Sequence, residues 1–455
     1  MLKKNEIYRA RVSGFTSEGL GVCRVDGCAV FVPNAAPDEE YDLRIVHIGK
    51  AAAHGRIVNI ITRSPDRVNR ACAYAKLCGG CDFWHLTYEA ELEIKRQRVL
   101  DALNRLGGQC LQALEITGAK TCLSYRNKAQ YPVSPEGEAG FFKKGTHEVV
   151  AIDRCLILPE ASDRARKIVL DWAKKYGVKP YDEATHTGLL RHIFVRTAAA
   201  TGQIMVCLVI NGEDIPHKKR LIDALTELDG MTSICLNINT RRGNAVLGEV
   251  TKTLRGSDAI EDVLCDLKFR ISPRSFYQVN RDQAEILYQK ALSAAALTGK
   301  ETVLDLYCGT GTITLCLAKN AREVIGVEVI DSAIENAVAN AERNGIENAR
   351  FFCADAGEAA ARLAAEGTKP DVIVVDPPRK GLSAEVIEAI REMSPDRVVY
   401  VSCDPATLAR DVKLLCACGY SLRHAEAVDL FPRCAHIETV VQLVRSKPDE
   451  NIDIC

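Results

Sequence analysis

The sequence predicts a multidomain fold: an N-terminal OB-type β-barrel, a central α+β domain with a cysteine cluster, and a C-terminal doubly wound α/β domain. Three observations favour this fold. With 455 residues the chain is too long for one compact core. Short β-rich runs separated by glycines fill residues 1–62, and strands alternate with helices over 276–455. Three closely spaced cysteines lie between these regions, at 72–81.

The N-terminal segment has the strand lengths and spacing of a small closed barrel. Its β-rich runs lie at 8–12, 19–22, 29–33 and 43–46. Barrels of this type often bind RNA, but plain scaffolding is at least as common. The pattern of strands leaves both roles open.

The central segment, 63–275, begins with a proline-containing linker at 64–67. A helix is predicted over 87–106, where glutamate, lysine and arginine form one face, and this helix can pack against the C-terminal domain. Strand-like and helical pieces then mix from 121 to 272, as expected of an α+β domain.

A C-x5-C-x2-C pattern with two adjacent glycines predicts a metal site in this central domain. Cys72, Cys78 and Cys81 supply three thiolates, and Cys155 is the leading candidate for a fourth ligand. Structural zinc sites usually pair two C-x2-C hairpins, whereas three clustered thiolates with a distant partner suit a [4Fe–4S] cubane better. The spacing favours an iron–sulfur cluster over zinc. It disfavours the third alternative, in which these cysteines bind no metal.

Composition predicts an ordinary globular protein of the cytoplasm. Hydrophobic residues make up 47% and charged residues 26% of the chain. No apolar stretch approaches the roughly 18–20 residues that span a bilayer, and the first residues lack the apolar core of an export signal. The 19 cysteines are therefore expected to be reduced thiols or metal ligands. Since the net charge is −1, any binding of nucleic acid must depend on local basic patches.

A glycine loop after a buried strand predicts a cofactor site in the C-terminal segment. The strand at 303–306 leads into Gly309 and Gly311, where missing Cβ atoms let the backbone approach a ligand. Glu328 closes the next strand, where a carboxylate can accept hydrogen bonds from a ribose diol. Because no third glycine follows in dinucleotide spacing, the pattern favours S-adenosyl-L-methionine (SAM) over NAD or FAD. A purely structural turn is the alternative.

A second strand, 372–375, ends in Asp376-Pro377-Pro378, a rigid turn that directs a carboxylate to the same edge of the sheet. A similar turn followed by an aromatic residue is familiar from methyltransferases that act on amino groups. Here Arg379 takes the place of the aromatic residue, which disfavours an amine substrate. The alternative is a turn with a structural role alone.

Cys403 and Glu438 are the candidate reacting groups. Cys403 ends the β-rich run that starts at Arg397, so the strand delivers its thiolate, a strong nucleophile, to the ligand crevice. Glu438 starts an apolar strand, where a carboxylate beside a nucleophilic thiol can act as a general base. The alternatives are a small buried hydrophobic residue at Cys403 and an edge-strand charge at Glu438. The nearby His436 is expected to be structural.

In combination these motifs resemble the bacterial RNA uracil-5-methyltransferases, particularly the iron–sulfur members that act on 23S ribosomal RNA. The resemblance covers nearly the whole chain. It is carried, in the family's order, by C-x5-CGGC, 125–128 (YRNK), 275–280 (SFYQVN), DLYCGTG, DPPRKG, SCDP and HIETV. The segment with Gly19-x-Gly21 and 31–33 (FVP) looks like the family's TRAM domain, an RNA-binding barrel of OB type.

The resemblance implies methyl transfer to C5 of a uridine in RNA, most specifically in 23S rRNA, by a monomeric enzyme. By position, Cys403 is then the nucleophile that adds to C6 and Glu438 the general base. Four cysteines correspond to ligands of the cluster: Cys72, Cys78, Cys81 and Cys155. Five residues correspond to the family's SAM site: Gln278, Tyr307, Glu328, Asp355 and Asp376. The target uridine must be flipped out of its stack or unpaired.

Two positions depart from the family's pattern. Asp38 stands where a glycine is common, which puts one turn of the barrel in doubt, and Cys434 replaces a usual threonine near the base. Cations of the central domain are expected to contact phosphates, or to form a solvated face: Arg126, Lys128, Lys143 and Lys144. A rival interpretation is an iron–sulfur protein that binds RNA without catalysis, for which Cys403 and Glu438 would have no use.

Overall fold

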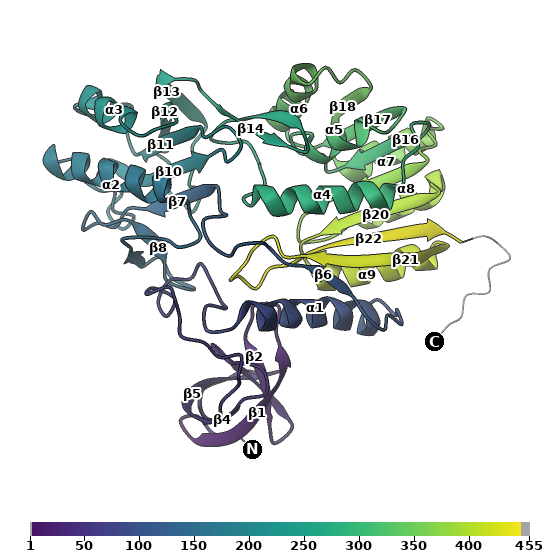
Figure 1. The fold of residues 1–455 in the computed structure, drawn as a ribbon, viewed down its shortest axis with the longest axis horizontal. Coiled ribbons are helices and arrows are strands. Elements are labelled where there is room, and N and C mark those ends of the chain that lie inside the picture. The colour runs from purple at the N-terminus through teal and green to yellow at the C-terminus, as the bar shows by residue number, and fades with distance from the viewer. Residues whose placement is uncertain (1, 447–455) are drawn as a thin grey trace.

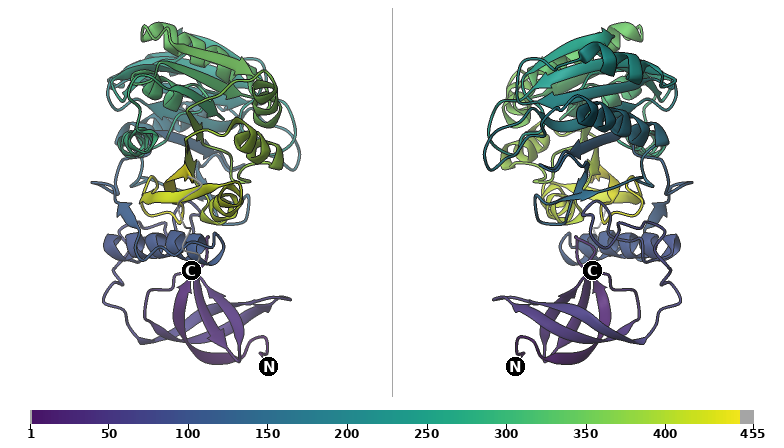
Figure 2. Two further views of the ribbon diagram at one scale, coloured as in Figure 1. Left: turned by 90° about the vertical axis from the view of Figure 1, so that its right-hand side faces the viewer. Right: turned by 90° about the vertical axis from the view of Figure 1, so that its left-hand side faces the viewer.

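The computed structural model describes residues 2–446 and arranges them in three units (Figure 1). The first unit is a closed barrel in the order β1-β2-β3-β5-β4, which confirms the predicted fold of this segment. Alternate residues point inward, so that Tyr41, Leu43 and Ile45 are fully buried along one strand. The strands are β1 (Ile7–Phe15), β2 (Gly21–Val25), β3 (Cys28–Val32), β4 (Glu40–Ile48) and β5 (Ala53–Thr62). Figure 2 shows this barrel below α1 in both side views.

The predicted helix of 87–106 forms as α1 (Tyr88–Arg105). It begins at Thr87, whose side chain accepts a hydrogen bond from the Ala90 backbone N–H. Its apolar face buries Val99 and Leu103 against the helix α9 (Pro405–Ala417). The helix therefore packs on the C-terminal domain, although it lies in the segment 63–275 that the sequence assigns to the central domain.

The central domain is built on a five-stranded sheet in the order β13-β12-β11-β10-β7, with α2 and α3 packed against it (Figure 1). Two short hairpins lie beside this sheet: β8–β9 contacts β7, whereas β14–β15 packs between the sheet and helices of the C-terminal domain. The elements are β7 (Lys128–Pro132), β8 (Gly140–Phe142), β9 (Val149–Ala151), α2 (Glu160–Lys175), β10 (Leu190–Thr197), β11 (Ile204–Ile210), α3 (Lys218–Thr226), β12 (Met231–Ile238), β13 (Val250–Gly256), β14 (Ile260–Leu264) and β15 (Leu267–Ile271).

The C-terminal domain is an eight-stranded sheet in the order β18-β17-β16-β19-β20-β22-β21-β6. The parallel strands of this sheet are β18, β17, β16, β19 and β20. The strand β22 runs antiparallel to both of its neighbours, β20 and β21. This is the predicted doubly wound arrangement, with helices packed on the sheet. Its elements are α4 (Arg281–Ala295), β16 (Thr302–Leu306), α5 (Thr312–Ala318), β17 (Glu323–Glu328), α6 (Asp331–Arg343), β18 (Ala349–Cys353), α7 (Ala356–Ala365), β19 (Val372–Val375), α8 (Ala384–Met393), β20 (Arg397–Ser402), β21 (Tyr420–Val428) and β22 (Glu438–Arg445).

Two features of this sheet differ from what the sequence pattern suggests. The edge strand β6 (Glu115–Thr117) comes from the segment before the central domain and pairs in parallel with β21. Glu438 does not lie on an edge strand, because β22 is enclosed between β20 and β21. The last nine residues of the predicted third domain lie outside the described part of the chain. No helix among residues 2–446 is both long and apolar enough to cross a membrane.

Candidate active site

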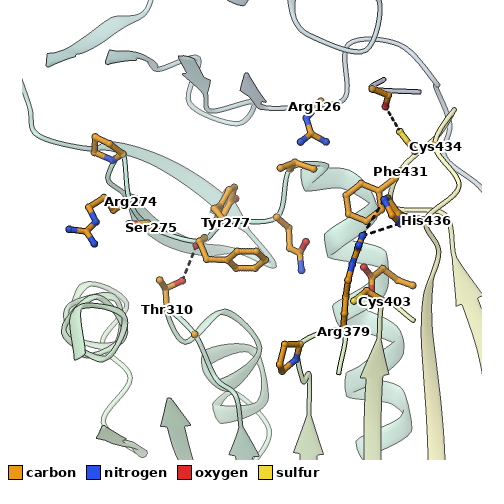
Figure 3. Close-up of a pocket in the computed structure, with 18 of the residues that line it drawn as sticks. Arg126, Arg274, Ser275, Tyr277, Thr310, Arg379, Cys403, Phe431, Cys434 and His436 are labelled. Atoms are coloured by element: carbon orange, nitrogen blue, oxygen red, sulfur yellow. Dashed lines mark hydrogen bonds between the residues drawn. The ribbon is translucent and has the colours of Figure 1, made fainter. Parts of the chain in front are cut away.

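A cavity of about 1430 Å³ lies between the central domain and the carboxyl ends of the C-terminal strands (Figure 3). Parallel strands of an open α/β sheet end at one edge, so the side chains that follow them converge there. The cavity brings together the predicted catalytic, cofactor and metal residues, except Gly311 of the cofactor loop. They are Gln278, Tyr307, Gly309, Glu328, Asp355, Asp376, Cys403 and Glu438, with Cys72, Cys78, Cys81 and Cys155.

At the cofactor end, the loop after β16 has a backbone that favours glycine. Gly309 and Gly311 have φ of 56° and 81°, and Tyr307 adopts a φ of 72° that is strained for a residue with a side chain. A Cβ on Gly311 would lie 3.1 Å from the Cβ of Ala337. Glycine at 311 thus lets the loop pack closely against α6, while Gly309 lines the cavity.

The acidic residues at this end are already hydrogen-bonded to the backbone. The Glu328 carboxylate accepts the Gly309 N–H at 3.1 Å and the Ile330 N–H at 3.0 Å. Asp355 caps α7 by accepting the N–H groups of Gly357 and Glu358. Both carboxylates are therefore fixed in direction on the cavity wall.

Asp305, within β16, lines a small second pocket together with Tyr307, Gly309 and Asp376; it begins the DLYCGTG motif, but no role was predicted for it. Its Oδ2 accepts a hydrogen bond from Thr314 at 2.5 Å, while its buried Oδ1 has no hydrogen-bond partner within residues 2–446. Burial, and to a lesser extent the charges of Asp376 and Glu328, raise the pKa of Asp305 to about 7. In the sequence, Asp305 could have been recognised as a functional candidate because it is the charged residue of a strand that is otherwise largely apolar.

At the reacting end, three acidic groups come from neighbouring strands. Cys403 directly follows β20, and Glu438 begins β22, whose Thr439 pairs with Ser402. Asp376 follows β19, the parallel neighbour of β20 on its other side. Adjacent strand ends therefore hold a thiol and two carboxyls at one corner of the cavity.

Burial makes this corner resist negative charge. It raises the pKa of Cys403 to about 11, with Glu438 and Asp376 adding repulsion. It raises the pKa of Asp376 to about 7, and it raises the pKa of Glu438 well above the usual range, with Asp376 contributing. At neutral pH the raised pKa therefore favours the thiol form of Cys403, so its action as a nucleophile requires loss of this proton.

Arg379 is a cation close to this acidic corner. Arg379 lines the cavity beside Cys403 and lowers the pKa of both Cys403 and Glu438 (Figure 3). Its Nη2 lies 3.2 Å from each ring nitrogen of His436. The sequence shows Arg379 only as a residue that replaces the aromatic residue of amino-group methyltransferases. Its contact with His436 could not be predicted, because the two residues are 57 positions apart.

The four cysteines line another part of the same cavity, but they do not form a metal-binding arrangement. Within residues 2–446 no three His, Cys, Asp or Glu side chains are gathered closely enough to hold a metal ion. The donor set nevertheless fits the predicted group chemically, since four thiols on one wall are a complete ligand set for a cubane. The [4Fe–4S] cluster stays a prediction.

The cysteine segment is hydrogen-bonded to the loop that leads into Glu438. The Cys434 thiol donates to the Gly80 carbonyl at 3.1 Å, and an Asp82 carboxylate oxygen accepts the Ala435 N–H at 3.0 Å. The backbone N–H groups of Asp82 and Phe83 both donate to the Arg433 carbonyl. Cys434, the departure from the family pattern, thus has a specific partner.

Of the four cations expected to contact phosphates, Arg126 alone lines the cavity. Lys143 and Lys144 pair with Glu148 and Asp82 at its outer side. Burial, together with Arg196 and Arg126, lowers the pKa of Lys128 to about 8. Within this set, Arg126 is placed best to meet a ligand in the cavity.

The fold and the site define a class. A doubly wound sheet with a glycine loop, and an acid at the end of the second strand, form a SAM-dependent methyltransferase domain, here joined to a barrel of OB type. Residues 87–446 match the tRNA (uracil-5-)-methyltransferase family and residues 2–58 match the TRAM domain. The chain belongs to this family of RNA methyltransferases.

Similar proteins agree with this membership over the whole chain. A protein of Clostridium acetobutylicum named as an RNA methyltransferase is 42% identical over 98% of both chains. One of Listeria monocytogenes with the same description is 44% identical over 97% of this chain and 98% of its own. The solved Pyrococcus abyssi tRNA (uracil-54, C5)-methyltransferase, in complex with S-adenosyl-L-homocysteine, is 28% identical, with a TM-score of 0.80 over 96% of this chain and 100% of that chain.

Proposed function

We propose that this protein transfers a methyl group from SAM to C5 of a specific uridine in 23S ribosomal RNA. The observation that carries the proposal is the convergence of Cys403, Glu438 and Asp376 at one corner of a cavity that also holds the cofactor loop. A methyltransferase that acts on an amino group needs no nucleophile, since the nitrogen itself attacks. A thiol beside two carboxyls instead fits a carbon acceptor that must first be activated.

Activation is needed because C5 of uracil is a weak nucleophile. The Cys403 sulfur bonds to C6, its proton passes to the Asp376 carboxylate, whose raised pKa suits that transfer, and electrons move to O4 as an enolate. C5 then attacks the methyl carbon of SAM and S-adenosylhomocysteine leaves. Glu438 removes the C5 proton, and elimination restores the C5–C6 double bond and frees Cys403. Covalent addition divides one difficult step into easier ones.

The assignment of Cys403 is tested by substitution. Cys403→Ala is expected to abolish transfer of labelled methyl from SAM to a uracil-containing transcript while SAM still binds. Cys418→Ala, at a half-buried cysteine outside the cavity, is the matched control and should retain activity. Nucleoside analysis should find 5-methyluridine as the product, and N-methylated bases instead would support the amino-group alternative. Turnover by Cys403→Ala would remove the nucleophile from the proposal.

The role of Glu438 predicts a trapped intermediate. Because addition and methyl transfer precede removal of the C5 proton, Glu438→Gln should accumulate a covalent enzyme–RNA adduct. The adduct is measured as a band of reduced mobility in a denaturing gel, and its RNA should carry the methyl group. A variant that is inactive without any adduct would assign the proton transfer to another group.

Two RNA classes compete as substrate. The cysteine motif resembles that of enzymes acting on 23S rRNA, whereas the similar Pyrococcus abyssi structure is that of a tRNA methyltransferase. Mapping 5-methyluridine in both RNAs from a strain that lacks the gene separates them. Loss of the modification from 23S rRNA alone supports the proposal, and loss from tRNA alone overturns this part of it.

We further propose that Cys72, Cys78, Cys81 and Cys155 hold a [4Fe–4S] cluster in a monomeric protein. When bound, the cluster would cross-link the cysteine segment to the central domain; no reaction step requires it. Protein purified without oxygen should contain about four iron atoms and acid-labile sulfide per chain. Cys155→Ser should lose both, whereas Cys122→Ser, outside the cavity, should keep them. Bound zinc, or no metal, would contradict the assignment.

A further inference from the structure

Arg379 is placed to offset the charges that the reaction must create. The reaction requires Cys403 as a thiolate and Glu438 as a carboxylate, and burial raises the pKa of both groups. The guanidinium lies on the turn after Asp376 and is exposed to the cavity. Figure 3 shows it beside Cys403 and extending toward His436. A positive charge at this position favours the charged form of each reacting group.

His436 holds this guanidinium in place. Desolvation and the charge of Arg379 lower the pKa of the imidazole, which favours the neutral ring. Arg379 Nη2 lies 3.2 Å from both ring nitrogens, and the unprotonated one of the two is an acceptor for it. The ring itself is fixed, because it lies edge-on against Phe431 with 5.9 Å between the centroids. The other charged groups that act on it are Asp82, Arg98 and Lys95.

The backbone around His436 is also fixed. Arg98 donates to the Ala435 carbonyl at 2.6 Å, and Asp82 accepts the Ala435 N–H. The Phe431 carbonyl accepts a hydrogen bond from Lys95 at 3.2 Å. Because the backbone before His436 is held by these bonds, the imidazole can serve as an anchor for the Arg379 side chain.

We propose that Arg379 sets the ionisation of Cys403 and Glu438, and that His436, as a neutral hydrogen-bond acceptor, positions Arg379 for this role. The inference rests on the proposed function, since it explains how the nucleophile and the base of that reaction reach their charged forms. Beyond that function, Arg379 and His436 are assigned as positioning residues, which act on the reaction through Cys403 and Glu438.

The reactivity of Cys403 toward iodoacetamide tests this without RNA or SAM. Alkylation requires the thiolate, so at a pH below the pKa the rate falls about tenfold for each unit by which the pKa rises. Peptide mass spectrometry follows Cys403 separately from the other cysteines, and the exposed Cys353 serves as the internal control. Arg379→Gln, neutral and of similar size, is expected to slow alkylation of Cys403 about tenfold.

Conservative variants distinguish positioning from a general structural effect. Arg379→Lys keeps the charge and should retain most of the reactivity. His436→Gln keeps an acceptor and should remain near the wild type, whereas His436→Leu should slow alkylation in the same direction as Arg379→Gln. Equal rates in the wild type and in Arg379→Gln would overturn the proposal, as would equal effects of His436→Gln and His436→Leu.

Methylation kinetics provide the second measurement. Arg379→Gln is expected to lower kcat about tenfold or more with RNA affinity changed less than twofold. If RNA affinity falls instead and Cys403 reacts normally with iodoacetamide, Arg379 is an RNA contact only and the proposal is wrong. If the wild type does not methylate uridine at all, the proposed function fails, while the alkylation rates still decide the roles of Arg379 and His436.

Discussion

At the scale of single residues, the site is defined by acidic groups whose pKa values burial raises, so that the uncharged form is favoured. Asp305, Asp376, Cys403 and Glu438 have raised pKa values, and for each the main cause is burial. Such clusters are costly for stability and are typical of active sites, where the charge is needed only during the reaction. SAM carries a positive sulfonium, so its binding would favour the ionised forms of the groups around it.

Asp376 gives a prediction with a definite sign. Its pKa is raised from 3.8 to about 7, so the folded protein binds this proton more tightly than the unfolded chain. The free energy of unfolding therefore falls as the pH rises from 3.8 toward about 7, and the loss is complete above that range. Asp376→Asn should raise the unfolding midpoint in urea clearly at about pH 8 and little at about pH 4, while abolishing methylation.

The comparison across pH is the control, because a change in packing would act alike at both values. An equal gain at both pH values, or a gain only in acid, would contradict a raised pKa at Asp376. Asp371→Asn, at a carboxyl that accepts the Thr302 N–H at 2.7 Å outside the cavity, should show no such gain in alkaline solution.

At the scale of elements, the loop before β22 is fastened to α1 by a buried ionic network. Lys95 is fully buried and donates to Glu91 and to Asp429, each at 2.7 Å. Glu91 also accepts a hydrogen bond from the backbone N–H of Arg433. Arg433 itself has a φ of 71°, in the left-handed region. Because these contacts surround the loop that carries His436, the ends of α1 and β22 are fixed relative to each other.

Removing the central cation should destabilise the protein strongly. Lys95→Met removes the buried ammonium between two buried carboxylates, and we expect a loss of about 3–5 kcal/mol in the free energy of unfolding. Arg96→Met, on the same helix, removes a pair with the exposed Glu93 and should cost less than about 1 kcal/mol. Urea titration of both variants measures the difference. Similar losses would mean that the buried network contributes no more than a surface ion pair.

The strand ends could be predicted from the sequence, whereas this network could not. Cys403, Asp376 and Gly309 each follow a β-branched run that proline or glycine stops, and parallel strands place such positions at one edge. Lys95 lies 334 residues from Asp429, and no local pattern indicates which lysine of a charged helix turns inward. The three-residue strand β6 is likewise too short to carry a periodic signal.

At the scale of the whole molecule, the barrel is packed on the rest of the protein. Ala36 and Phe15 contact Phe83 and Leu86, which lie between the cysteine segment and α1. Gly19 approaches this contact so closely that a Cβ would lie 2.9 Å from the Phe83 ring. The barrel therefore presents its outer surface at a fixed position relative to the cavity.

Two exposed arginines of the barrel are expected to extend the interface with RNA. Arg44 and Arg56 face each other across β4 and β5. Replacing both by alanine should weaken RNA binding and reduce the slope of log K against log salt by about 0.7–0.9 for each phosphate that the barrel no longer neutralises. SAM affinity should not change. Arg9→Ala is the control, because Arg9 pairs with Asp42 at 3.2 Å. An unchanged slope in the double variant would place the RNA elsewhere.

The order of segments in the chain has a consequence for how the protein is made. Tyr88 on α1 donates a hydrogen bond to Asp429, 341 residues later, and β6 must also wait for β21. At a synthesis rate of roughly 5–20 residues per second, α1 leaves the ribosome roughly 20–70 s before its partners exist. The barrel can close at once, but the apolar face of α1, with Val99 and Leu103, stays uncovered during that time. This face is therefore available to chaperones, and to aggregation, until the last strands emerge.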